Sequence, residues 1–250
     1  MTFFDKVLDL IFPNNFKCIF CGCEISASNP PYVCEKCSQT LPLIKGKICL
    51  RCGEPIFSMS DYCIRCKDNI RFFNLARAPF LYEHPISTLI HGFKYRNQKY
   101  TFESLAKYLE QCYLENDYNA DLIVPVPSSK KRLKERGYNQ AELLSKQLSK
   151  LLGIKLETDV LIKVRHTPPQ TTLNYFERQK NLFGSFAVEN QEKIIGKNVL
   201  LVDDVLTTGA TINHCSEVLK LSKAKRVFVL TLARTQSELV QKGLKNTCKK

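Results

Sequence analysis

The sequence contains no apolar run long enough to cross a membrane, because a membrane-spanning helix needs about 20 consecutive, mostly apolar residues. It also contains no G-x-x-x-x-G-K-[ST] segment, which excludes a P-loop nucleotide site. Residues 1–12 are rich in apolar side chains but lack the basic start of a signal peptide, so we expect a short amphipathic helix that packs on the protein. These absences favour a cytoplasmic protein without a membrane span.

The composition is that of a globular protein with a strong positive charge. Of its 250 residues, 44% are hydrophobic and 24% charged, which allows one good core and a smaller module. The formal net charge is +13, and basic residues gather in three groups: Lys130, Lys131, Arg132, Lys134 and Arg136; Lys220, Lys223, Lys225 and Arg226; and Lys242, Lys245, Lys249 and Lys250. Such groups attract phosphate-bearing partners or form a solvated surface, and the second interpretation is favoured slightly for the C-terminal group.

The chain has twelve cysteines, an unusual number for a cytosolic protein unless they bind metal. Eight form four C-x-x-C pairs: Cys18/Cys21, Cys34/Cys37, Cys49/Cys52 and Cys63/Cys66. One pair directs two thiolates at an ion and two pairs complete a tetrahedral site, so the spacing predicts two structural zinc sites. Sequential pairing is simplest, although the two middle pairs could share an ion. Of the other cysteines, Cys112 and Cys215 fit small core positions, and Cys23 and Cys248 lie outside the pattern.

After Cys66 the sequence changes to alternating strand and helix patterns. Apolar runs predict strands at 77–82, 122–126, 156–162, 199–202 and 227–232, and helical periodicity is found at 85–92, 103–118, 138–152 and beyond 211. Such alternation implies an α/β fold with a parallel sheet flanked by helices, and a binding site at the carboxyl ends of its strands. We therefore expect a cysteine-rich module at 1–70 and an α/β domain at 71–250.

Residues 199–211 carry the most specific chemical pattern. The buried-strand pattern of 199–202 ends in two carboxylates, Asp203 and Asp204, and a helical pattern begins after the segment Thr207, Thr208, Gly209, Ala210 and Thr211. Backbone N–H groups at the start of a helix, threonine hydroxyls and a glycine that admits close approach together form an anion site. Two carboxylates beside a phosphate cradle suit a phosphorylated sugar with a hydrated magnesium ion.

Acidic pairs after an apolar strand also occur in receiver domains and in Walker B segments. A receiver needs most of its domain after the pair, and a Walker B segment needs the P-loop that is absent here. The segment instead resembles the phosphoribosyl pyrophosphate (PRPP) motif of type I phosphoribosyltransferases. The resemblance implies that Asp203 and Asp204 are the catalytic pair that contacts the ribose 2′ and 3′ hydroxyls. It also implies that residues 207–211 hold the 5′-phosphate.

A second segment that fits this resemblance follows the predicted strand at 122–126. Here a proline-broken, basic loop contains Lys130, Lys131 and Arg132. In the family a loop at this place holds the pyrophosphate, and cationic side chains suit that task. The alternative is a solvated basic loop.

A third segment is the long polar stretch 165–186, which contains Arg165, Gln170 and Arg178. A loop of this length in a compact domain is often functional, and we expect a lid that excludes water from the reacting sugar. The alternative is a surface excursion with one short helix.

Taken together, the cysteine module and these three segments resemble the ComF family, which joins an N-terminal zinc module to a phosphoribosyltransferase-like domain. The resemblance implies binding of Mg-PRPP and a part in DNA uptake by naturally competent bacteria. The lid and loop are also similar to those of glutamine amidophosphoribosyltransferases. Those enzymes carry an N-terminal glutaminase domain where this chain has cysteine-rich residues, so we do not expect glutamine-dependent chemistry.

Three functions remain open at this point. The first is an enzyme that transfers ribose from PRPP to an acceptor that the sequence does not identify. The second is a single-stranded DNA-binding factor, in which aromatic residues of the cysteine module stack on bases or, as we prefer, form the cores of its ribbons: Phe20, Tyr32, Phe57 and Tyr62. The third is a docking module for another protein, such as a component of the competence machinery, with a regulatory phosphoribosyl site.

Overall fold

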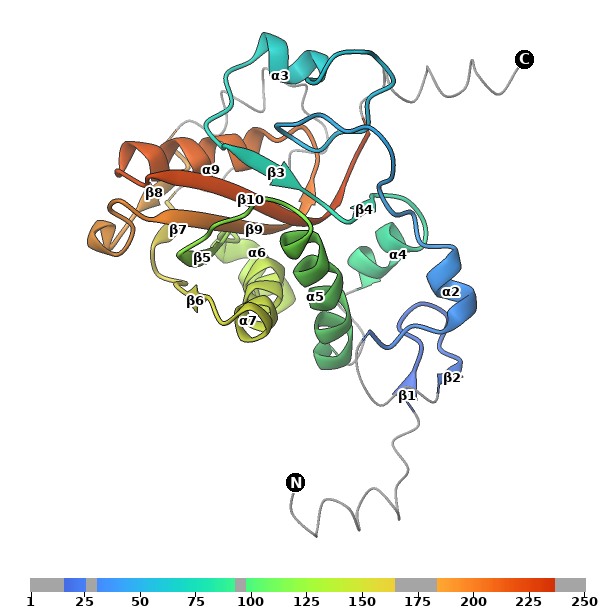
Figure 1. Ribbon diagram of the computed structural model, residues 1–250. Coiled ribbons are helices and arrows are strands. Elements are labelled where there is room, and N and C mark those ends of the chain that lie inside the picture. Colours follow the sequence, from blue (N-terminus) through green and yellow to red (C-terminus); the bar gives the residue numbers. More distant parts are fainter. Residues whose placement is uncertain (1–15, 26–30, 93–97, 165–183, 237–250) are drawn as a thin grey trace.

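The computed structural model describes residues 16–25, 31–92, 98–164 and 184–236. A central sheet of six strands forms the α/β part of the chain (Figure 1). Its strand order is β3-β10-β9-β5-β6, β4 also pairs with β10, and all of these pairings are parallel. The strands are β3 (Leu75–Arg77), β4 (Phe80–Leu81), β5 (Leu122–Pro125), β6 (Lys155–Leu156), β9 (Asn198–Leu206) and β10 (Arg226–Arg234). This confirms the predicted parallel α/β architecture.

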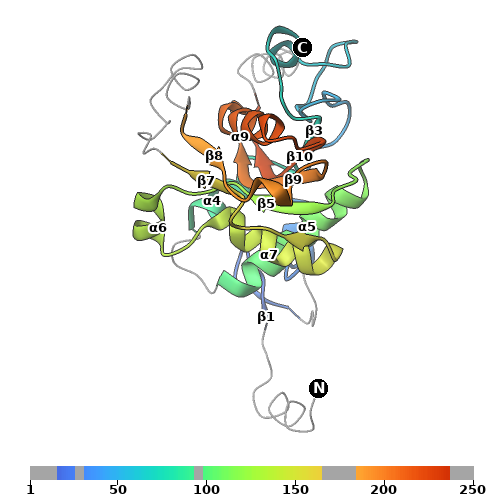
Figure 2. The same cartoon turned by 90° about the vertical axis from the view of Figure 1, so that its left-hand side faces the viewer.

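Helices cover both faces of the sheet, as both faces of a parallel sheet are apolar. They are α4 (Ile86–His91), α5 (Gln98–Leu114), α6 (Lys130–Arg136), α7 (Gln140–Leu152) and α9 (Ala210–Leu221), with a 3-10 turn, η3, at Gln191–Lys193. Figure 2 shows α9 on one face and α5 and α7 on the other. Along β9, Val199 and Leu201 join the core beneath α9, whereas Leu200 and Val202 join the core beneath α5 and α7. This two-residue alternation buries the strand on both sides.

Two of the predicted strands are divided in the structure. The segment expected at 77–82 forms β3 and β4, which are separated by Pro79, a residue without the N–H group that a strand ladder needs. The segment expected at 156–162 forms β6 and then β7 (Leu161–Lys163), which pairs antiparallel with β8 (Phe186–Val188) outside the central sheet. The two-stranded sheet of β7 and β8 is therefore separate from the central sheet.

The basic segment expected as a loop after β5 is instead the helix α6. Ser129 caps its start, because its hydroxyl accepts a hydrogen bond from the Arg132 N–H at 3.3 Å. Gly137 ends it with a left-handed φ of 81°, which glycine adopts without a steric penalty. These two caps at the correct spacing explain why a short helix forms from a run of like charges.

The two halves of the cysteine module lie on opposite sides of the sheet (Figure 1). The first half contains β1 (Phe16–Lys17), β2 (Glu24–Ile25) and α2 (Glu35–Gln39), and it packs beside α5, where the Tyr32 N–H donates to the Ser104 hydroxyl at 3.0 Å. The second half contains α3 (Ile64–Asp68), and its cysteines belong to the core on the α9 side. We call these halves the first and second ribbon.

Some expectations concern segments without a described structure. The amphipathic helix expected at 1–12 and residues 165–183 of the expected lid lie outside the described residues. Within the described ranges, no helix is both long enough and apolar enough to cross a membrane.

Candidate functional site

The second ribbon brings four thiols together. The sulfur atoms of Cys49, Cys52, Cys63 and Cys66 all lie within 4.8 Å of one another, and all four residues are buried. Gly53 makes the turn after Cys52 with a φ of +70°, and Cys63 caps the start of α3. Four converging thiols in a closed position match the ligand set of a structural zinc site.

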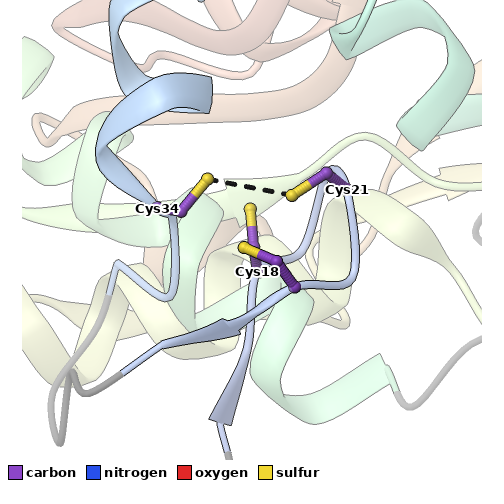
Figure 3. A group of neighbouring side chains, drawn as sticks. Cys18, Cys21 and Cys34 are labelled. Carbon is purple, nitrogen blue, oxygen red and sulfur yellow. Dashed lines mark hydrogen bonds between the residues drawn. The ribbon is translucent and has the colours of Figure 1, made fainter.

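The first ribbon forms a second group of thiols that is more exposed. Its four sulfur atoms within 4.8 Å belong to Cys18, Cys21, Cys23 and Cys34. Figure 3 shows Cys18, Cys21 and Cys34 turned toward one another, with 3.7 Å between the sulfur atoms of Cys21 and Cys34. We call this group, together with Cys37, the first cluster, and the four thiols of the second ribbon the second cluster.

Cys37, which the spacing predicts as a ligand, lies beside Cys34 but is not one of the four thiols whose sulfur atoms lie within 4.8 Å of one another. Its backbone N–H donates to the Cys34 sulfur at 3.4 Å. Burial raises the pKa of the Cys37 thiol, and hydrogen bonds with Cys34 and Cys21 raise it further. Cys23, which stands outside the C-x-x-C pattern, thus takes the place in this group for which the spacing predicts Cys37.

The acidic pair lies inside β9, which continues four residues beyond its predicted end. The Asp203 carboxylate accepts the Asp204 N–H at 2.9 Å, and the Asp204 carboxylate accepts the Val205 N–H at 2.7 Å. Burial raises the pKa of Asp203 well above its usual value, and the adjacent charge of Asp204 raises it further. The two carboxylates therefore lie next to each other at the carboxyl end of the sheet.

The segment 207–211 makes the predicted turn into a helix. Gly209 caps α9 with a φ of +79°, and the Thr208 hydroxyl accepts the Ala210 N–H at 3.4 Å. Thr207 is exposed, and Thr208 and Thr211 are half-buried. The twelve-residue helix α9 therefore begins shortly after the acidic pair, and the N–H groups of its first turn carry a partial positive charge of about half a unit.

The basic helix α6 stands at the same edge of the sheet. Pro125, the last residue of β5, pairs with Val202, so the chain that leads into α6 leaves the sheet beside Asp203. Lys130, Lys131 and Arg132 are all exposed. Burial raises the pKa of Asp203 most. The positive charge of Arg132 lowers it, so Arg132 is the one of these three residues that interacts electrostatically with Asp203.

Two further side chains lie near enough to the acidic pair for their charges to interact with it, and sequence reasoning did not identify them. Burial lowers the pKa of Lys163 in β7, Arg132 lowers it further, and Asp203 acts in the opposite direction. Burial raises the pKa of Tyr82, with a smaller contribution from the charge of Asp204, and the Tyr82 hydroxyl lies 2.8 Å from His91 Nε2. Neither residue belongs to a sequence motif, because tertiary packing alone brings it to the site.

The aromatic residues of the cysteine module divide into two kinds. Tyr32 is only 6% exposed and stacks on Phe16 with 4.8 Å between ring centroids, as expected for a ribbon core. Phe57 and Tyr62 in the second ribbon are 70% and 43% exposed, so they are surface residues. The lid residues Arg165, Gln170 and Arg178 lie outside the described part of the chain.

Comparison with protein families gives two matches along the chain. Residues 7–67 match the double zinc ribbon domain, and residues 94–248 match the phosphoribosyl transferase domain. A double zinc ribbon followed by a phosphoribosyl transferase domain is the class of protein that these matches define. The two thiol clusters fit the first match, and the parallel sheet fits the second.

Relatives define the family more narrowly. The chain is 32% identical to competence protein F of Haemophilus influenzae over 228 residues, which cover 88% of this chain and 97% of that protein. It is 30% identical to the DNA utilization protein YhgH of Salmonella typhimurium, over 81% of this chain and 90% of that protein. It is 27% identical to competence protein ComFC of Bacillus subtilis, over 81% of this chain and 84% of that protein. The chain belongs to the competence protein F family.

Proposed function

We propose that this protein binds Mg-PRPP at the carboxyl end of β9 and acts in the uptake or use of DNA. The observation that carries the proposal is a carboxylate pair, Asp203 and Asp204, followed within one short turn by a helix start at Gly209–Ala210. A phosphate needs the helix start, and vicinal sugar hydroxyls need acceptors beside it. The match to the phosphoribosyl transferase domain supports this assignment.

Each part of the site has a separate task in the proposed chemistry. The amides and hydroxyls of 207–211 hold the 5′-phosphate. Asp203 and Asp204 accept hydrogen bonds from the ribose hydroxyls and from water molecules that would surround a magnesium ion, which prefers oxygen ligands. As an acceptor attacks C1′ of the ribose, the C1′–O bond to pyrophosphate breaks. Arg132, with Lys130 and Lys131 beside it on α6, offsets the negative charge of the leaving pyrophosphate.

The biological setting is proposed from the relatives. Their names refer to competence and to DNA utilization, and the proteins align with this chain over most of its length. The proposal places the protein in the cytoplasm, where thiols stay reduced and available for zinc. PRPP would then be its small-molecule partner, and components of the competence machinery its protein partners.

Calorimetric titration of the zinc-loaded protein with Mg-PRPP tests the proposed site. The wild type should bind one PRPP per chain, and the double variant Asp203→Asn/Asp204→Asn should bind at least about tenfold more weakly, since charge-assisted contacts are lost. Asp159→Asn is the matched control, because it removes a carboxylate that pairs with Lys193 on the exposed surface at 2.6 Å. Unchanged affinity in the double variant would rule the site out.

A second candidate function is single-stranded DNA binding by the second ribbon, with the phosphoribosyl site in a regulatory role. The exposed Phe57 and Tyr62, which lie between the two C-x-x-C pairs of this ribbon, favour it. Fluorescence anisotropy should show DNA affinity that falls steeply with salt and is weakened in Phe57→Ala/Tyr62→Ala. Leu221→Ala, an exposed apolar residue of α9, should have no effect. Absence of binding at low salt would exclude this function.

A further inference from the structure

A narrow slot lies between the second ribbon and the turn that joins β9 to α9. Its walls are formed by Cys52, Glu54 and Arg65 of the ribbon, by Arg71 and Arg234, and by residues 207–209 of the turn. Three guanidinium groups thus share this region with one carboxylate. Among these side chains the arginines outnumber the carboxylate, but a zinc ion held by the four thiolates of the second cluster would itself carry two net negative charges, so the charge count alone does not select an anion and the partners of each arginine decide.

Two of the three guanidinium groups have partners that attach the ribbon to the sheet. Arg234, at the end of β10, donates through Nη1 to the Cys52 carbonyl and lies 3.7 Å from Glu54 through Nη2. Arg65 Nη2 lies 4.0 Å from the same carboxylate. Glu54 and Arg234 are each only 2% exposed, so this is a buried structural connection. The charge of Glu54 is therefore matched by arginines other than Arg71.

The side chain of Asn213, in the first turn of α9, holds the backbone around Arg71. The side chain of Asn213 accepts the Phe72 N–H at 2.9 Å and donates to the Ile70 carbonyl at 3.1 Å. These two bonds fix the backbone on both sides of Arg71. As a result its Nη1 atom lies 3.6 Å from the position that a Cβ atom on Gly209 would occupy.

Two of the three nitrogen atoms of the Arg71 guanidinium, Nε and Nη1, are buried without a hydrogen-bond acceptor. The residue is 8% exposed, and neither Nε nor Nη1 donates a hydrogen bond to any described residue. In particular, neither nitrogen donates to a sulfur atom of the second cluster. A buried donor without an acceptor is costly, and a buried charge more so, so these two nitrogen atoms call for an acceptor that the described residues do not supply, and a phosphate oxygen is one such acceptor.

We propose that Arg71 is a phosphate-binding residue of the site at 207–211, so that the segment leading out of the zinc module completes the pocket for a sugar phosphate. The inference rests on the proposed function and extends it to a residue outside the PRPP motif. A phosphate at the start of α9 receives the amides of the turn from one side and the planar fork of Arg71 from the Gly209 side. Arginine suits this position because its fork donates two parallel hydrogen bonds to phosphate oxygens.

The test measures binding of ribose 5-phosphate and of Mg-PRPP by the zinc-loaded full chain. Arg71→Gln should weaken binding of both ligands by about tenfold or more while the zinc content stays at the wild-type value. Arg71→Lys keeps the charge without the fork and should bind with intermediate affinity. Lys47→Gln is the control, because it removes one positive charge from the second ribbon at a residue that pairs with the exposed Asp61.

A measurement on the wild type keeps the test valid if Arg71→Gln does not fold. The Nε–H resonance of Arg71, assigned by its loss in Arg71→Lys, should shift when ribose 5-phosphate is added. An unchanged resonance would overturn the proposal. So would a folded, zinc-loaded Arg71→Gln that binds ribose 5-phosphate as tightly as the wild type does, or one whose affinity loss is reversed by added zinc, since Arg71 would then only balance thiolate charge.

The outcome also separates this inference from the proposed function. If the wild type binds Mg-PRPP but Arg71→Gln binds it equally well, the inference alone fails. If the wild type binds ribose 5-phosphate through Arg71 but binds Mg-PRPP no more tightly than ribose 5-phosphate, the PRPP assignment fails and the role of Arg71 stands.

Discussion

Gly53→Ala provides a sharp test of how the second ribbon is attached to the sheet. A left-handed φ of +70° costs an L-residue roughly 1–2 kcal/mol relative to glycine. At Gly53 there is also a clash, because the added Cβ would lie 2.9 Å from the Ala76 carbonyl oxygen in β3. Forced overpacking of this kind costs about 1–3 kcal/mol more. We therefore expect a total loss of about 2–5 kcal/mol, a large part of the 5–15 kcal/mol typical of a domain.

Gly153→Ala is the matched control for this prediction. Gly153 ends α7 with a φ of +68°, but a Cβ there would meet nothing within 4 Å, so only the backbone cost of about 1–2 kcal/mol applies. Urea unfolding of both variants, at one fixed excess of zinc because bound metal stabilises the folded state, measures the difference. If Gly53→Ala is no more destabilising than Gly153→Ala, the ribbon does not pack on β3 as described.

Two further predictions concern the thiol clusters and the acidic pair. Zinc should leave the first cluster faster than the second during chelation followed by a colorimetric indicator, because Cys21 and Cys23 are exposed whereas all four thiols of the second cluster are buried; release in a single phase from both clusters would contradict this. Asp203→Asn should raise the urea midpoint at pH 7. Burial, and then the charge of Asp204, raise the pKa of Asp203 in the folded state. The protein therefore has its full stability below the ordinary pKa of 3.8 and loses part of it as the pH rises through the folded-state pKa, a loss that asparagine avoids. The gain should disappear below that ordinary value, and an equal gain at acidic and neutral pH would exclude this explanation.

Local sequence patterns predicted the features that depend on neighbouring residues. The pairs Cys49/Cys52 and Cys63/Cys66 form one thiol cluster because each pair is a tight turn that places both thiols on the same side. Likewise, the apolar run of β9, the carboxylates after it and Gly209 dictate a strand, an acidic edge and a left-handed turn into α9. These are short-range consequences of residue type, so the sequence alone was sufficient.

The features that the sequence did not predict depend on contacts between distant segments. Lys163 comes near enough for its charge to interact with Asp203 because β7 pairs with β8 beside the sheet, and Arg71 lies against Gly209 because Asn213 holds its backbone. The helix α6 was missed for a different reason. A run of like charges suggests a solvated loop, but Ser129 and Gly137 cap it at the correct spacing for a short helix.

The most direct test of the proposed site is the amide spectrum of the isotopically labelled, zinc-loaded protein during titration with Mg-PRPP. The account predicts large shifts of the backbone N–H resonances of Gly209, Ala210 and Thr211, because these groups would donate to the 5′-phosphate at the start of α9. It also predicts that the same shifts occur with ribose 5-phosphate alone. Saturating Mg-PRPP that leaves these three resonances in place would contradict the account.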